Sequence, residues 1–240
     1  MIISLELVSL SALMFAVHYT IFRDAHYIFS YLIITLAFLP LEVLLVTIII
    51  SQLLTIRETR VRLEKLNMVI GVFLNEVGIP LLTSFSDLDP NLEKIRNDLI
   101  LTTKETEQEF STISKRLMDY EFGIDIHRIN LEDLRSYLMG KRDFLLRLLE
   151  NPVLLEHESF TDLLLAVFHL IDELMHRVDL KQIPESDLYH IRGDIKRAYT
   201  ALVIQWLTYM KHLKESYPYL FSLAMRTNPF DRDASPIVRS

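Results

Sequence analysis

The chain has 240 residues and a formal net charge of −7 at pH 7, because 32 Asp and Glu residues outnumber 25 Lys and Arg residues. With 24% charged residues and a mean hydropathy of only +0.25, it is too polar for a transporter made mostly of membrane spans, and its composition fits one membrane hairpin joined to one soluble domain. The acidic balance argues against a nucleic-acid partner, since phosphate backbones bind basic surfaces, and the absence of cysteine excludes disulfides, cysteine-bound metal clusters and thiol catalysis.

Two apolar segments predict a transmembrane hairpin over residues 1–55. Residues 28–54 contain a single charged side chain, Glu42, and residues 2–22 form a weaker apolar segment that contains Glu6. A helix of about 20 apolar residues crosses the hydrocarbon core of a bilayer, so we expect spans at about 2–22 and 28–54 and a lipid bilayer as one partner. In the alternative arrangement, residues 2–22 lie partly in the membrane interface and only the second segment spans.

The charges that flank these segments predict their orientation. Arg57, Arg60, Arg62 and Lys65 follow the second segment, whereas the link over residues 23–27 carries one basic and one acidic residue. Cytoplasmic loops of membrane proteins are enriched in Lys and Arg. We therefore expect a multi-pass protein of the plasma membrane whose N- and C-termini are both cytoplasmic.

Two acidic residues fall within the predicted spans. Antiparallel pairing about residue 25 sets Glu6 level with Leu44, so that Glu6 and Glu42 lie at similar depth. A carboxylate at this depth is costly unless it is protonated, paired or facing water. The pair predicts either a proton or cation site or a protonated Glu42 hydrogen-bonded to a Ser or Thr of a neighbouring helix, next to a kink at Pro40, and we favour the second interpretation.

Residues 56–80 predict an amphipathic helix that connects the hairpin to the soluble domain. Apolar residues recur there at steps of three and four, as on the seam of a coiled coil: Leu63, Leu66, Ile70, Phe73 and Val77. No Pro or Gly lies between residues 41 and 70, so one nearly continuous helix is expected over residues 43–77, ended by the sequence Gly78-Ile79-Pro80. The seam then packs the soluble bundle or holds a homo-oligomer together.

Residues 81–230 predict a cytoplasmic helical bundle, followed by a polar tail over residues 231–240, so the predicted fold class is all-α. Capping and breaking residues divide the bundle into helices from Pro90 to Tyr120, from the cap Asn130 to Glu150, from the cap Ser159 to about Asp179, from Asp187 to Ser216 and from Tyr219 to Arg226. The third of these helices has an expected buried stripe of Phe160, Leu164, Val167, Ile171, Leu174 and Val178. Trp206 is expected in the core.

One group of residues on the last long helix pair has the composition of a metal site. Glu173 and His176 form a Glu-x-x-His pair, a spacing found in carboxylate-bridged di-iron bundles. An antiparallel helix pair with its link centred near residue 183 sets His176 opposite His190 and Glu173 beside Asp194. Two imidazoles and two carboxylates suit a divalent Zn, Mn or Fe ion. We favour the alternative that these are solvated residues near helix ends, because one Glu-x-x-His pair is common by chance, and we expect no other cofactor.

Four segments resemble a family of uncharacterised prokaryotic two-span membrane proteins with a C-terminal cytoplasmic helical domain. They are LAFLPLEVLLVTIII, LEKLNMVIGVFLNEVG, FTDLLLAVFHLIDEL and YPYLFSLAMRTNPFD, and the similarity runs over most of the chain from the second span onward. The resemblance implies a bacterial or archaeal plasma membrane. It implies no activity, cofactor or site residue.

The sequence favours a membrane-anchored helical interaction or regulatory module that forms a homo-oligomer or binds a protein partner. The sequence contains no Gly-x-Ser-x-Gly, Walker or His-Glu-x-x-His motif that would indicate an enzyme class. Two alternatives remain open. One is a metal-dependent membrane-bound enzyme that uses Glu173, His176, His190 and Asp194, and the other is a small ion-conducting oligomer centred on Glu42.

Overall fold

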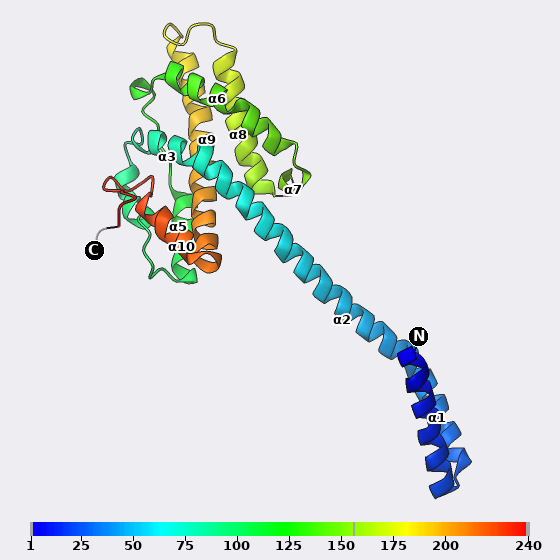
Figure 1. The fold of residues 1–240 in the computed structure, drawn as a ribbon. Helices are drawn as coiled ribbons and strands as arrows, with labels where there is room; N and C mark the ends of the chain where they lie inside the picture. The colour runs from blue at the N-terminus through cyan, green and yellow to red at the C-terminus, as the bar shows by residue number, and fades with distance from the viewer. Residues whose placement is uncertain (1, 156, 239–240) are drawn as a thin grey trace. The chain divides into compact units, whose positions relative to one another are not determined.

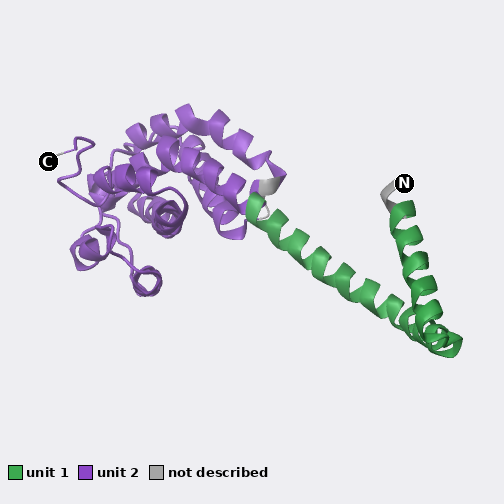
Figure 2. Cartoon of the chain, turned by 60° about the horizontal axis from the view of Figure 1, so that its bottom comes forward, with its two compact units in different colours: residues 1–61 green, residues 62–240 purple. Residues whose placement is uncertain are grey.

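The structure is a computed structural model that describes residues 2–155 and 157–238, and every regular element in these residues is helical (Figure 1). The expected all-α class is therefore confirmed. The chain divides into two compact units, residues 1–61 and 62–240 (Figure 2). Helix α2 begins in the first unit and ends in the second.

The first unit is a helical hairpin made of α1 (Ile2–Phe22) and the beginning of α2 (Ala25–Phe73). Only two residues join the helices, which is fewer than the predicted link. Arg23 has a φ of 51°, in the left-handed region, and the carboxylate of Asp24 accepts a hydrogen bond from the Tyr27 amide at 3.0 Å, so it caps the start of α2. The rings of His18 and Tyr27 stack at 5.6 Å across the turn. The chain thus reverses direction at once.

The side chains of this hairpin are almost entirely exposed. Two helical stretches, Leu5–Phe22 and Ala25–Ser86, are long and apolar enough to cross a membrane by length and composition, and no residue in their most apolar windows is buried. The helix continues through Pro40. A proline inside a helix removes one backbone hydrogen bond, and here the flanking turns stay helical.

The second unit begins with the end of α2, whose predicted apolar seam is buried at four of its five positions. Leu66, Ile70, Phe73 and Val77 are at most 4% exposed, and Phe73 packs edge-on against Phe160 with ring centroids 5.2 Å apart. Leu63 is 47% exposed and is not part of the core of this chain. The seam is occupied within one chain, because helices of the same bundle cover it.

The predicted helix end at Gly78-Ile79-Pro80 is also wrong. One π-helical turn, η1 (Leu74–Gly78), follows α2, and α3 (Ile79–Ser86) continues from it with Pro80 in its first turn. A proline is tolerated there because the first amides of a helix need no partner within the helix. The Tyr137 hydroxyl donates a hydrogen bond to the Glu76 carbonyl of the π turn at 3.0 Å, which ties this irregular turn to α6 (Leu131–Leu149).

The remaining helices of the second unit are η2 (Leu92–Lys94), α4 (Arg96–Leu99), α5 (Glu107–Asp119), η3 (Ile126–Arg128), α7 (Pro152–Leu155), α8 (Glu158–Met175), α9 (Glu185–Ser216) and α10 (Pro218–Arg226). Among them, α8 and α9 are the longest.

The single helix predicted from Pro90 to Tyr120 is wrong, because two short helices and a loop precede α5. The buried side chains of Leu92, Leu99 and Leu101 hold this segment irregular, and Thr106 with Glu109 forms the capping box that starts α5.

The predicted helix caps agree with the structure at Asn130 but not at Ser159. The Asn130 side chain accepts hydrogen bonds from the amides of Glu132 and Asp133, at 3.1 and 3.3 Å. At α8 the cap is His157, whose Nδ1 accepts from the Phe160 amide at 3.3 Å. Since α8 ends at Met175, Val178 lies beyond the helix and is 96% exposed, in contrast to the rest of the predicted stripe.

The core of the second unit surrounds α9, the long helix that crosses it in Figure 1. Tyr199 and Trp206 are its largest buried side chains, as expected for Trp206. Trp206 packs against Phe230, and the side-chain amide of Asn228 donates to the Leu99 carbonyl at 2.7 Å. The chain therefore contributes to the core as far as Phe230, directly before the predicted polar tail.

Candidate functional site

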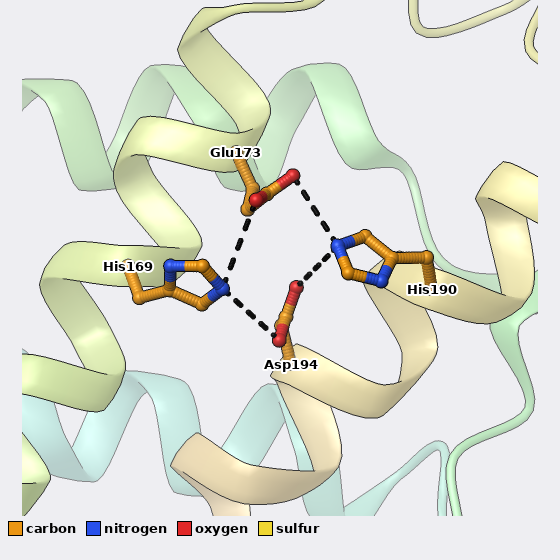
Figure 3. Close-up of side chains that lie close together, drawn as sticks. All are labelled: His169, Glu173, His190 and Asp194. Atoms are coloured by element: carbon orange, nitrogen blue, oxygen red, sulfur yellow. Dashed lines mark ion pairs between the residues drawn. The ribbon is translucent and has the colours of Figure 1, made fainter.

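Antiparallel helices α8 and α9 each contribute a histidine and a carboxylate to one cluster (Figure 3). His169 and Glu173 lie one turn apart on α8, and His190 and Asp194 lie one turn apart on α9. Residues at i and i+4 share a helix face, so both pairs point into the interface between α8 and α9. One ligand atom from each residue lies within 4.8 Å of those of the other three.

The four groups alternate around a ring of imidazole and carboxylate. His169 Nε2 lies 3.4 Å from Asp194 Oδ1 and 3.7 Å from Glu173 Oε1. His190 Nε2 lies 3.5 Å both from Glu173 Oε2 and from Asp194 Oδ2. Figure 3 shows these four contacts closing a square. Asp194 is buried, whereas both imidazoles are exposed on one side, so the ring opens to solvent.

The sequence predicted Glu173, His190 and Asp194 for this cluster but placed His176 where the structure has His169. His176 follows the last residue of α8, and its Nδ1 contacts the Asp172 carbonyl at 2.7 Å, which holds the ring at the helix end. The link between α8 and α9 is longer than predicted and is centred nearer residue 180 than residue 183. The contacts across the interface pair His190 with Glu173, three residues before His176, so the facing position lies almost one turn nearer the middle of α8.

Arg177 joins the two helices beside the cluster. Its Nη1 lies 2.7 Å from Glu173 Oε2 on α8, and its Nε donates to Asp187 Oδ2 on α9 at 2.7 Å. Hydrogen bonds from the guanidinium lower the pKa of both the Glu173 and the Asp187 carboxyls, and these two partners raise the pKa of Arg177. Arg197 contacts Asp194 Oδ1 at 3.0 Å in the same way. Both carboxylates of the cluster thus have a cationic neighbour.

Replacing Arg177 by Gln should lower the stability of the chain at neutral pH and make that stability less dependent on pH in the acidic range. A carboxyl whose pKa is lowered by folding stabilises the folded state above its ordinary pKa, and this stability is lost as pH falls through the folded value. The wild type should therefore lose stability below the ordinary values of 4.5 for Glu173 and 3.8 for Asp187, more steeply than Arg177→Gln. Thermal unfolding of both chains across this range measures the two slopes, and parallel slopes would contradict the assignment.

The two acidic residues of the predicted spans do not form a comparable cluster. Glu6 and Glu42 are both exposed, and neither belongs to the group of His and carboxylate side chains that lie close together in the part of the chain that the structure describes. Their predicted equal depth stays a prediction.

The fold and the cluster together define an all-helical protein with an apolar N-terminal hairpin and a larger helical unit that carries a His and carboxylate cluster. The chain belongs to the family described as "Uncharacterized protein MJ1433, C-terminal helical domain", which matches residues 62–226, and residues 1–54 match "MJ1433, N-terminal helical domain".

A relative from Methanocaldococcus jannaschii, itself described as "Uncharacterized protein MJ1433", is 50% identical over 231 residues that cover 96% of this chain and 93% of the relative. The resemblance to an uncharacterised prokaryotic helical family is thus confirmed. No solved structure matches the chain significantly. The family match that begins at residue 62 coincides with the boundary between the two compact units.

Proposed function

We propose that this protein is a membrane-anchored helical module of the prokaryotic plasma membrane. In this proposal, α1 and the first part of α2 span the bilayer, both termini are cytoplasmic, and residues 62–240 act in the cytoplasm as an interaction or regulatory module.

The observation that carries the proposal is the uncovered apolar surface of the hairpin. Large apolar side chains are at least 40% exposed on both helices, for example Leu10 on α1 and Leu44 and Ile49 on α2. Transfer of one such side chain out of water contributes about 1.5 to 3 kcal/mol, so a bilayer stabilises this surface far more than water does. At about 1.5 Å per residue, residues 28–54 form a helix of roughly 40 Å, which is enough to cross a hydrocarbon core of about 30 Å.

The basic residues after the second segment support the orientation. Arg57, Arg60, Arg62 and Lys65 follow it within eleven residues, and positive charge of this kind favours the cytoplasmic side. The net charge of the chain is nevertheless negative, so the basic cluster is a local feature.

The module is proposed to act through protein contacts, with a second copy of the chain as the partner. Because the seam of Leu66, Ile70 and Phe73 is buried within the chain, the side chains of α2 that remain for a partner are on another face of the helix. Met68 and Val72 are exposed there, four residues apart. The mass of the purified chain in detergent measures the number of copies.

Alkaline extraction tests the anchoring. Membranes from cells that produce the chain should retain it after washing with sodium carbonate and release it only with detergent. Replacing both Leu44 and Ile48 by Arg should weaken retention, because each charge at the centre of a span costs about 2.5 to 3.5 kcal/mol. Leu63→Arg is the matched control, and it should leave retention unchanged because Leu63 follows the span. Release of the wild-type chain by carbonate alone would contradict the proposal.

A further inference from the structure

We propose that His169, Glu173, His190 and Asp194 form a binding site for one divalent transition-metal ion, represented by Zn²⁺. The site belongs to the helical unit 62–240, and the proposal does not depend on membrane anchoring.

The ligand atoms lie close enough together to reach tetrahedral coordination through side-chain rotation. With metal–ligand distances of about 2.0 to 2.2 Å, neighbouring ligand atoms of a tetrahedron lie about 3.3 to 3.6 Å apart. Between each imidazole and the carboxylate oxygen that no arginine contacts, the distances are 3.7 Å from His169 Nε2 to Glu173 Oε1 and 3.5 Å from His190 Nε2 to Asp194 Oδ2. With one ligand atom taken from each residue, all four lie within 4.8 Å of one another. All four residues come from regular helices, with one i, i+4 pair on each. An ion therefore requires the most widely separated ligand atoms to approach one another by up to about 1.5 Å, which side-chain rotation can supply without movement of the helices.

The carboxylate of Asp194 gives an independent reason to place an ion there. Its side chain is 3% exposed, and within the described residues its Oδ2 atom is buried without a hydrogen-bond partner. A buried polar atom without a partner costs about 1 to 3 kcal/mol, and more when it is charged. Oδ2 lies 3.5 Å from His190 Nε2, which is too long for a hydrogen bond but suits two atoms that bind the same ion.

The neighbouring arginines leave one oxygen of each carboxylate available. Arg177 contacts Glu173 Oε2, and Arg197 contacts Asp194 Oδ1, so Glu173 Oε1 and Asp194 Oδ2 are not engaged by an arginine. When both imidazoles are neutral, the negative charges of the two carboxylates equal the positive charges of the two guanidinium groups. A dication would then be held mainly by direct bonds from the four ligand atoms.

The donor atoms select the class of metal. Two imidazole nitrogens with two carboxylate oxygens suit Zn²⁺, Mn²⁺ or Fe²⁺, whereas Mg²⁺ and Ca²⁺ prefer sites made of oxygen alone. His169 and His190 are 46% and 55% exposed, which leaves an entry path from solvent. The site can therefore load from solution without unfolding of α8 or α9.

Metal titration of the full chain tests this inference. The chain, purified in detergent without a histidine tag and stripped with a chelator, should bind one equivalent of Zn²⁺ per chain near neutral pH and unfold at a higher temperature with it. Mg²⁺ and Ca²⁺ should not raise the unfolding temperature. Co²⁺ should give the intense visible absorption of a tetrahedral site.

Substitutions on both α8 and α9 identify the ligands. His169→Gln and His190→Gln alter half-exposed side chains and should keep the fold while lowering Zn²⁺ affinity at least about tenfold. Asp194→Asn should do the same and keeps the shape of the buried side chain. His176→Gln is the matched control, a histidine at the end of the same helix but outside the ring, and it should bind Zn²⁺ as the wild type does.

Three results would overturn the inference. They are no Zn²⁺ bound by the wild type, equal affinity in the wild type and in the double variant His169→Gln/His190→Gln, and loss of binding in His176→Gln. Each would leave the cluster as a set of histidine–carboxylate ion pairs.

Discussion

The Phe73→Asp substitution should unfold the helical unit, with a loss of more than about 4 kcal/mol in the free energy of unfolding. Phe73 has no exposed surface and packs against Phe160 of α8, so the new carboxylate would be buried without a partner. The same change also removes a large apolar side chain and leaves a cavity. Chemical denaturation of the purified chain, followed by the signal of Trp206, measures the loss.

Leu63→Asp is the control for this experiment, since Leu63 lies on the same helix but is 47% exposed. It should cost less than about 1 kcal/mol, as is usual for surface substitutions. Equal effects of the two substitutions would mean that this end of α2 is not part of the core.

Gly71→Ala should destabilise the chain by about 1 to 3 kcal/mol, although alanine favours helices more than glycine does. A Cβ atom at Gly71 would lie 2.8 Å from Tyr209 Cζ, so the tyrosine ring must move away from α2. Tyr209 is half-buried against α2, and the ring has limited room. The position of α2 on α9 therefore depends on a residue without a side chain.

Gly140→Ala makes the same change where nothing lies within 4 Å, in the exposed middle of α6. It should stabilise the chain by about 0.5 to 1 kcal/mol through helix propensity alone. Thermal unfolding of both variants shows whether the unfolding temperature falls for Gly71→Ala and rises for Gly140→Ala. The double variant Gly71→Ala/Tyr209→Leu should recover part of the loss, because the two sites are coupled. A stabilising Gly71→Ala would contradict the close packing.

The sequence predicts correctly the elements that are marked by a periodic apolar pattern or by a local capping residue. The seam of α2 at Leu66, Ile70 and Phe73 is buried as the spacing indicates, and Asn130 caps α6. It predicted poorly where tertiary contacts override local preference. The segment after Pro90 is polar enough to suggest one helix, but its leucines are drawn into the core, and Pro80 is accommodated by a π turn that no propensity indicates.

Three of the four cluster residues could be predicted, and the fourth could not, for a geometrical reason. The facing positions on α8 and α9 depend on where α8 ends, and helix ends are the least certain part of a sequence prediction. The sequence did contain a signal for His169, because His169 with Glu173 and His190 with Asp194 repeat the same i, i+4 spacing on both helices. The Glu-x-x-His pair drew attention to His176 instead.

Cysteine labelling of the full chain in its membrane tests the proposed anchoring most directly, because the natural sequence has no cysteine. The proposal predicts that His26→Cys, at the hairpin turn, reacts with a membrane-impermeant maleimide in intact cells. Ser111→Cys, exposed on α5, should react only after the membrane is permeabilised. The proposed orientation would be contradicted if Ser111→Cys reacted in intact cells while His26→Cys reacted only after permeabilisation. The hairpin itself would be contradicted if both variants reacted equally without permeabilisation.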